Sequence, residues 1–458
     1  MNVGSTRRHF LEVTGTTMGI AGLGGPFVPA STSEIAPPAV ANAPARPKVA
    51  ALATVYHYLS HAYHIVGRFV DGFPVHDGRG LHVPPFDIAS LFIEQTPDKT
   101  DLGRAKAKSH GIRTSTSIAD ALTLGTGKLA VDAVLLIAEH GEYPYNEKLQ
   151  KLYPRGRFFR EVLEVFKASG RSVPVFIDKH LSYSRVEASE MVTQARSLNV
   201  PLMAGSSLPI TWRLPPLEIP LGRQFKEVVV ASRGDLEIFG FHALETLQCM
   251  VERRERHGRP QGAVAVTCLE GDAVWAAGDQ GVWSWPLLEH ALGRSHTVNP
   301  GDIKQNTRDF MPPAATGRDA LTKLRHPIAF VVEYADGLRA TVLILNGHVD
   351  DTTFAARINA ADGSDTIVST LTYLPAPPGA SFFNPLVLRI EDFFRTARPP
   401  YPVERTLLTG GILDVVLESR IKEHKRIDTP DLATIDYQAP ADSGFIRTPL
   451  TNPEPNRL

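Results

Sequence analysis

Short apolar runs and amphipathic helical patterns alternate along the first half of the chain. Two of the runs, residues 133–138 and 173–177, are bounded by polar residues or proline, which is typical of buried parallel strands. The stretch 158–169 between them has apolar residues at helical spacing and ends at Gly170. This rhythm predicts an α/β fold with a doubly wound parallel sheet. The expected strands are 49–56, 86–94, 112–115, 131–138, 173–177 and 201–204, and the expected helices are 60–70, 101–111, 117–124, 158–169 and 184–198.

The pattern changes after residue 213, where strands follow one another with few helices between them. Asp336-Gly337 separates two of these strands and is a strong hairpin signal. The pattern predicts an α+β domain with an open, mainly antiparallel sheet, one face of which is covered by helices. The expected strands are 226–232, 263–269, 328–333, 338–345 and 365–374, and the expected helices are 237–254, 386–396 and 404–423. We therefore expect a first domain at 47–212, a second domain at 213–427 and an irregular C-terminal tail at 428–458.

The N-terminal segment has the layout of a twin-arginine signal peptide. Arg7-Arg8 is followed by a weakly apolar, glycine-rich stretch and then by Val28-Pro29-Ala30, whose small residues suit a cleavage site. We predict a signal peptide at residues 1–30, recognised by the twin-arginine export machinery, and a linker at 31–46. The mature protein is then periplasmic or extracellular. The alternative is a chance arginine pair beside an unstructured tail.

Composition excludes several classes of function. The chain has 458 residues, a formal net charge of -1 and 43% hydrophobic residues, which gives no reason to expect a nucleic-acid partner. No apolar run reaches the length of about 20 residues that a membrane span requires. Two cysteines, Cys249 and Cys268, cannot build a disulfide framework or a cysteine-based zinc site. They are either buried thiols or a single bridge.

Three histidines near the first helix could in principle bind a transition metal. His57, His61 and His64 are four and three residues apart, and His76 and His82 follow downstream. No carboxylate or cysteine falls at ligand spacing among them, so we predict no metal site.

Ionisable residues stand directly after two of the expected buried strands. Glu139-His140 follows the strand at 131–138, and Asp178-Lys179-His180 follows the strand at 173–177. In an open α/β sheet, ligands bind outside the carboxyl ends of the strands. A lysine at such a position is costly unless it is paired, which favours a functional role for Lys179. These residues therefore mark the expected site.

Four segments in order resemble the Gfo/Idh/MocA oxidoreductases over about residues 47–425. They are SHGIRTSTSIADALTLGTGKLAVDAVLLIAEHGEYPYNE, IDKHLSYSRVEASEMVTQARSLNVPLMAGSS, GFHALETLQCMVERR and GGILDVVLESRIKE. The resemblance implies a Rossmann-like dinucleotide-binding domain followed by a substrate and oligomerisation domain. It also implies oxidation or reduction of a CH–OH group on a sugar-like or polyol substrate through NAD or NADP. The antiparallel sheet of this family commonly joins subunits, so a homo-oligomer is expected.

The resemblance assigns catalytic roles to two residues. Lys179 matches the family lysine that approaches the nicotinamide and the substrate, and it would polarise the reacting oxygen. His242 in GFHALE matches the family's catalytic histidine, which acts as acid or base. The family often has an aspartate four residues earlier, but Ile238 stands there and Glu237 lies on another helix face. The alternative for His242 is a core histidine without a catalytic role.

Further binding residues follow from position. Tyr56 and His57 lie in the first loop, Glu94 follows the second strand where an acid could hold a ribose hydroxyl, and Glu139 and His140 follow the fourth. These five residues, with Lys179, form the expected cofactor site. The expected substrate contacts are His180, Trp212 and Arg213, although Arg213 could equally pair with an acid for structural reasons.

The first loop departs from the family pattern. His61-Ala62 matches its end, which places Ala53, Val55 and Tyr58 at the three glycine positions. Glycine is needed there for the tight turn and for close approach to the pyrophosphate. Either the loop follows another path or the cofactor site is lost. Two functions therefore remain open: a nicotinamide-dependent oxidoreductase, and a non-catalytic or repurposed homologue that binds a carbohydrate or protein partner without NAD(P).

Overall fold

The computed structural model describes residues 45–75, 80–256, 258–308, 326–360, 362–375 and 377–448. The expected signal peptide at residues 1–30 and most of the linker lie outside the described residues, as does the end of the C-terminal tail. No helix in the described part of the chain combines the length and apolar composition that a bilayer crossing requires.

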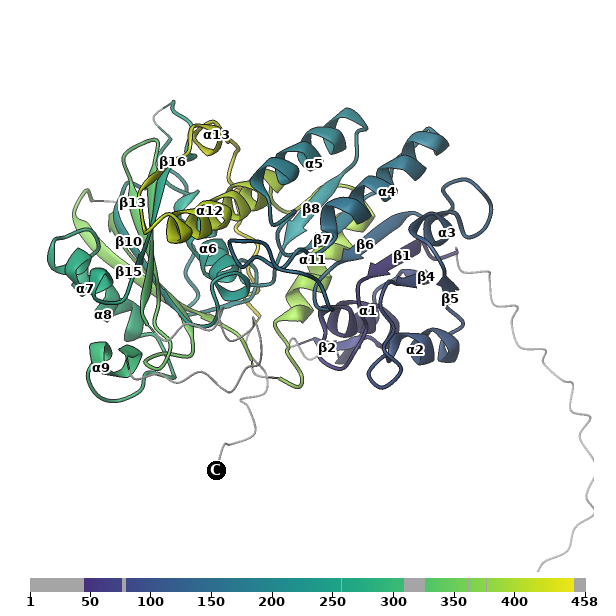
Figure 1. Ribbon diagram of the computed structural model, residues 1–458, viewed down its shortest axis with the longest axis horizontal. Helices are drawn as coiled ribbons and strands as arrows, with labels where there is room; N and C mark the ends of the chain where they lie inside the picture. The colour runs from purple at the N-terminus through teal and green to yellow at the C-terminus, as the bar shows by residue number, and fades with distance from the viewer. Residues whose placement is uncertain are drawn as a thin grey trace, which may run out of the picture. The chain divides into compact units, whose positions relative to one another are not determined.

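The first sheet is parallel throughout and has the strand order β5-β4-β1-β6-β7-β8. Figure 1 shows its helices on both faces, which confirms the predicted doubly wound sheet. The strand order reverses between β1 and β6, where ligands bind in such folds. The strands are β1 (Lys48–Ala53), β4 (Asp87–Ile93), β5 (Arg113–Ser115), β6 (Ala133–Ile137), β7 (Val175–Asp178) and β8 (Leu202–Gly205), and a small hairpin joins β2 (Phe73–Val75) to β3 (Gly80–His82).

Alternate residues of each buried strand enter two different cores. Ala50 and Leu52 of β1 pack toward α3 (Ile118–Thr123), α4 (Arg155–Ser169) and α5 (Arg185–Ser197). The intervening residues of β1 pack toward α1 (His61–Asp71) and α11 (Phe383–Thr396), while α2 (Gly103–Ser109) lies beside β4 and β5. Helix α11 follows β15 of the second sheet in sequence, yet it packs against the first sheet.

The second sheet is antiparallel except for the pairing of β10 with β13. Its strand order is β16-β11-β12-β13-β10-β14-β15-β9. Gly337 adopts a φ of 92° in the predicted hairpin turn between β12 and β13, a conformation that favours glycine. The strands are β9 (Trp212–Leu214), β10 (Phe225–Ser232), β11 (Ala263–Glu270), β12 (Ile328–Tyr334), β13 (Arg339–Ile344), β14 (Thr352–Asn359), β15 (Asp365–Tyr373) and β16 (Ile427–Asp428).

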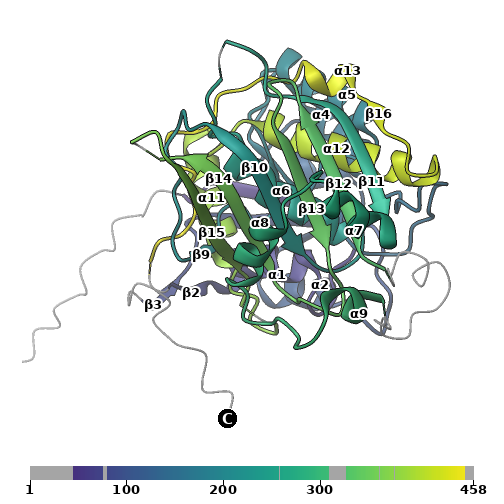
Figure 2. The same cartoon turned by 90° about the vertical axis from the view of Figure 1, so that its left-hand side faces the viewer.

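Both faces of the second sheet carry helices, so the expectation of a single covered face is wrong. The predicted helices α6 (Ile238–Val251) and α12 (Val403–Ile421) pack on one face. Two helices that the sequence pattern did not reveal, α7 (Asp272–Asp279) and α8 (Trp285–Leu292), pack on the other. Figure 2 shows α7 and α8 in front of the strands and α6 and α12 behind them. Two short helices, α9 (Ile303–Arg308) and α13 (Pro430–Ala433), complete the described elements.

Candidate functional site

A cavity of about 670 Å³ lies between the carboxyl edge of the first sheet and the second domain. Its walls combine residues from strand ends, from α1 and α6, and from loops of the second domain. Most of its lining side chains are polar, ionisable or aromatic. Those used below are His61, Glu139, His140, Lys179, Ser206, Ser207, Arg233, Phe239, His242, Asp350, Tyr373, Phe382 and Phe383.

Lys179 enters the cavity from the end of β7 and is almost fully buried, with 2% of its side chain exposed. Its ammonium lies 3.1 Å from the Glu139 carboxylate, and Arg155 at the start of α4 pairs with the other oxygen of that carboxylate. Burial alone would raise the pKa of Glu139. The two cations outweigh burial and hold its pKa well below the ordinary value. The cluster is therefore a buried carboxylate shared by two cations.

A second pair joins α1 to the same strand end. The Nδ1 atom of His61 lies 2.6 Å from Oδ2 of Asp178, whose side chain is fully buried. The His61 ring also contacts the rings of His140 and Phe383, at centroid distances of 5.3 Å and 5.2 Å. The sequence placed Asp178 in the polar cluster after its strand but gave it no binding or catalytic role, and it gave His61 none either. The sequence signal for these two residues was their position: His61 begins α1 and Asp178 ends β7.

His140 and His57 form a further aromatic contact at this edge, with ring centroids 5.5 Å apart. His140 follows β6 with a φ of 68°, and burial, followed by the charge of His61, lowers its pKa to about 3. The ring is therefore neutral near pH 7. His140 lines the cavity as expected, while the His57 Nδ1 lies 2.9 Å from the carbonyl of Tyr58.

His242 enters the cavity from α6, opposite Lys179, so the structure brings the two predicted catalytic residues to one cavity. Its Nδ1 atom lies 3.0 Å from the Ser206 hydroxyl and 3.7 Å from the carboxylate of Glu245, three residues later on the same helix. Burial, then the nearby Lys179, lowers the pKa of His242 well below its ordinary value. The expectation that His242 lacks a local acid is wrong, because Glu245 in GFHALE supplies one at helical spacing.

His180 does not reach the cavity lining. Its ring is buried, 5.3 Å from that of Phe241 on α6, and its Cβ lies close to Gly410 of α12. The predicted substrate role is therefore not supported by its position. The side chain lies between two helices of the second domain.

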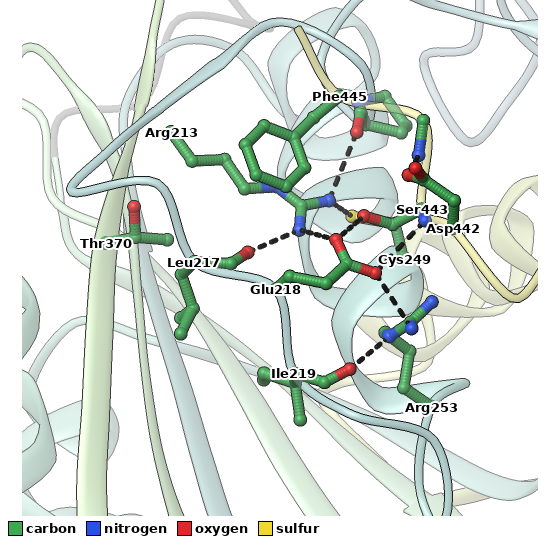
Figure 3. A network of polar contacts seen from close by, with 12 residues as sticks. Arg213, Leu217, Glu218, Ile219, Cys249, Arg253, Thr370, Asp442, Ser443 and Phe445 are labelled. Atoms are coloured by element: carbon green, nitrogen blue, oxygen red, sulfur yellow. Dashed lines mark hydrogen bonds and ion pairs between the residues drawn. The ribbon is translucent and has the colours of Figure 1, made fainter. Parts of the chain in front are cut away.

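Trp212 and Arg213 hold the C-terminal tail instead of facing the cavity. Figure 3 shows the buried Arg213 guanidinium stacked over the Phe445 ring, 4.3 Å from its centroid. It donates to the carbonyl of Leu217 at 2.8 Å, and the indole of Trp212 donates to the carbonyl of Thr448 at 2.9 Å. The surroundings of Arg213 favour the structural role that the sequence left open over a substrate contact.

Arg253, two residues after the end of α6, also holds the C-terminal tail. Its guanidinium donates to the carbonyls of Pro440 and Ala441, both at 2.9 Å, and pairs with Glu218 at 2.8 Å, as Figure 3 shows in part. The cysteine near this network, Cys249, is a buried free thiol, and so is Cys268. The tail is thus strapped to the second domain by buried arginines.

The loops after β4 and β6 meet over the carboxyl end of β1. The side-chain amide of Gln95 donates to the carbonyl of Glu142 at 3.0 Å and accepts from its backbone N–H at 2.9 Å. Next to it, Glu94 accepts from the Tyr143 hydroxyl at 2.5 Å and pairs with Arg157 of α4. Glu94 therefore already has two partners and is not poised for a ribose.

Val55 and Tyr56 fill the space below this bridge. Val55 is 3% exposed, and a side chain at Gly141 would begin 3.3 Å from its Cγ1. Tyr56 turns inward against α2, where a side chain at Gly103 would begin 2.8 Å from its Cβ. This is the place where a dinucleotide-binding domain admits the pyrophosphate. The side chains that occupy this corner do not fit a pyrophosphate in the standard position, and the cofactor roles of Tyr56 and Glu94 stay predictions.

Among the described residues, no group of three or more His, Cys, Asp or Glu side chains is arranged so that it could hold a metal ion.

The comparisons with known proteins identify the fold. No family model matches the sequence, and no curated protein sequence matches it. Among solved structures, GenD2 from gentamicin A biosynthesis in complex with NAD superposes with a TM-score of 0.52 at 13% identity, covering 84% of this chain and 96% of that chain. A myo-inositol 2-dehydrogenase from Lactobacillus plantarum covers 84% and 99% at 11% identity, with a TM-score of 0.46. A super-repressor mutant of Gal80p from Saccharomyces cerevisiae covers 85% and 100% at 9% identity, with a TM-score of 0.48. The resemblance stated from the sequence is confirmed at the level of the fold: this chain has the two-domain fold of the Gfo/Idh/MocA oxidoreductases.

Proposed function

We propose that the protein is a repurposed relative of these oxidoreductases that binds a sugar-like or polyol molecule in the cavity without NAD or NADP. The observation that carries this proposal is the bridge over β1, where Gln95 and Glu142 exchange two hydrogen bonds. A dinucleotide in the standard position would have to break this bridge and displace the Val55 side chain. The cavity next to the bridge keeps its space and its polar lining.

The charges of the cavity favour a neutral ligand. Lys179 is paired with Glu139, and Arg233 is paired with Asp350 at 2.8 Å. Neither cation is held ready for the carboxylate or phosphate of an acidic ligand. Four aromatic rings offer apolar faces among these polar groups: Phe239, Tyr373, Phe382 and Phe383. A sugar-like or polyol molecule, with hydroxyl groups and C–H faces, matches both features.

A second candidate is an NAD(P)-dependent oxidoreductase acting on the CH–OH group of such a molecule. It is favoured by Lys179 and His242, which face one cavity from two domains. The resemblance assigns these residues to polarisation of the reacting oxygen and to acid–base catalysis. This candidate requires the loops that carry Gln95 and Tyr143 to move away from the carboxyl end of β1, where the pyrophosphate would lie.

Binding experiments separate the two candidates. We expect native mass spectrometry, or titration with glucose and myo-inositol, to show a sugar-sized ligand in the wild type. The variant Lys179→Met is expected to lose that ligand, and the surface control Glu161→Gln is expected to keep it. Titration calorimetry with NAD, NADH, NADP and NADPH should show no binding tighter than about 1 mM.

Micromolar binding of any of the four nucleotides would contradict the proposal and establish the second candidate. If neither a carried ligand nor binding of the two probes is found, the assignment of the cavity to neutral polyols is wrong.

We also propose export through the twin-arginine pathway, supported by Arg7-Arg8 and the small residues before Ala30. The double variant Arg7→Lys, Arg8→Lys is expected to keep the uncleaved protein in the cytoplasm of the producing bacterium. Immunoblotting of cell fractions measures this. An unchanged distribution of the double variant would mean that another signal directs the chain.

A further inference from the structure

Ser206 connects the cavity histidine to a buried acid. It follows Gly205 at the end of β8, and 3% of Ser206 is exposed. Its backbone N–H donates to Oε1 of Glu245 at 3.0 Å, and its hydroxyl contacts Oε2 of the same carboxylate. The Ser206 oxygen also lies 3.0 Å from Nδ1 of His242. One serine is therefore bonded to both the acid and the imidazole.

Gly205 makes this arrangement possible. Its φ of 135° lies in the region that favours glycine, and a side chain there would begin 2.9 Å from Oε1 of Glu245 and 2.7 Å from the Tyr401 hydroxyl. The backbone can thus approach the buried carboxylate closely enough for Ser206 to contact it. Glycine before Ser206 is therefore required for the contact between Ser206 and Glu245.

The directions of the hydrogen bonds follow from the groups involved. An ionised carboxylate accepts hydrogen bonds and cannot donate them, so the Ser206 hydroxyl must donate to Glu245. The serine oxygen then has lone pairs and no further hydrogen to offer. The contact with His242 can form only if Nδ1 carries the hydrogen and donates it. The other nitrogen, Nε2, is left with a lone pair.

We propose that Ser206 and Glu245 are positioning residues that hold neutral His242 in the Nδ1–H tautomer, so that Nε2 keeps its lone pair and accepts a hydrogen bond from a ligand hydroxyl in the cavity. The Glu245 carboxylate, 3.7 Å from Nδ1, also favours the hydrogen on that nitrogen. This role rests on the proposed function, because it makes the cavity a ligand site.

The tautomer can be measured without any ligand, by ¹⁵N NMR of histidine-labelled full-length protein. Burial raises the pKa of Glu245 to about 7, so the spectra are recorded at pH 8.5, where the carboxylate is ionised. In the wild type we expect His242 to show a protonated Nδ1 and an unprotonated Nε2. Ser206→Ala and Glu245→Ala should each lose this exclusive tautomer, and Ser206→Thr should restore it.

Ser207→Ala is the matched control, because Ser207 is the next residue, lines the same cavity and should leave the His242 signal unchanged. Retention of the other histidine signals shows that each variant is folded. A wild-type His242 protonated on Nε2, or an Nδ1–H tautomer that persists in Ser206→Ala, would overturn the inference. Neither result depends on ligand binding, so failure here is distinct from failure of the proposed function.

Discussion

Glu139 holds two buried cations with one carboxylate. Its oxygens contact the Lys179 ammonium at 3.1 Å and the Arg155 guanidinium, and all three side chains are almost fully buried. Such a group costs desolvation free energy to assemble, and removing one member leaves uncompensated charge in a low-dielectric interior. The folded arrangement of Lys179 and Arg155 beside the cavity therefore depends on the charge of Glu139.

The substitution Glu139→Gln tests this dependence. We expect the free energy of unfolding to fall by about 3–5 kcal/mol, because the amide cannot neutralise the two cations. Urea denaturation measures the change. The control Glu161→Gln removes an exposed ion pair with Arg157 on α4 and should cost about 0–1 kcal/mol. Equal losses in the two variants would show that the buried cluster contributes nothing special.

Single residues also show what the sequence could predict. The expected strand ends placed Glu139, His140 and Lys179 at the carboxyl edge of the parallel sheet, and all three line the cavity there. Ser206 and Glu245 meet only when β8 and α6 are packed together, so no local pattern joins them. The junction position of Arg213 suggested a site, but the tail that covers it comes from the far end of the chain.

Helices α7 and α8 cover the face of the second sheet that lies opposite α6 and α12. Trp275 and Leu287 from these helices pack against alternate strand residues such as Val229 and Leu343. These strand residues point away from α6 and α12, so the sheet is buried on both faces. The sequence pattern predicted β10, β11, β12, β13, β15 and the two long helices, but it did not predict β14, an eight-residue strand between β10 and β15. It missed α7 and α8, which have only eight residues each.

The covered face argues against a homo-oligomer joined through the bare strands of this face of the sheet. An interface through this face would require α8 to leave β10 and β14. We therefore expect light scattering after size-exclusion chromatography to give the mass of a monomer at micromolar concentration. In the variant Leu287→Asp, which unseats α8, exposed apolar sheet surface should promote self-association. A wild-type dimer would mean that another surface joins the subunits.

The whole molecule follows the predicted order of elements, with both sheets in the expected halves of the chain. The sequence could predict this order because local periodicity distinguishes strands from helices. It could not predict how the halves are tied together. Helix α12 makes such a tie, since Thr406 donates to the carbonyl of Ala204 at 2.7 Å and Asp414 pairs with Arg185 of α5 at 3.1 Å. The cavity is assembled by these long-range contacts.

The return of α11 to the first sheet has a consequence for how the protein is made. Leu386, Ile390 and Phe393 of this helix belong to the core beneath β1 and α1. On a translating ribosome, every strand of the first sheet emerges well before this helix does. Part of one apolar face of the nascent sheet, the part that α1 does not cover, therefore stays exposed until residue 396 has left the exit tunnel, and a chaperone can bind it during that interval.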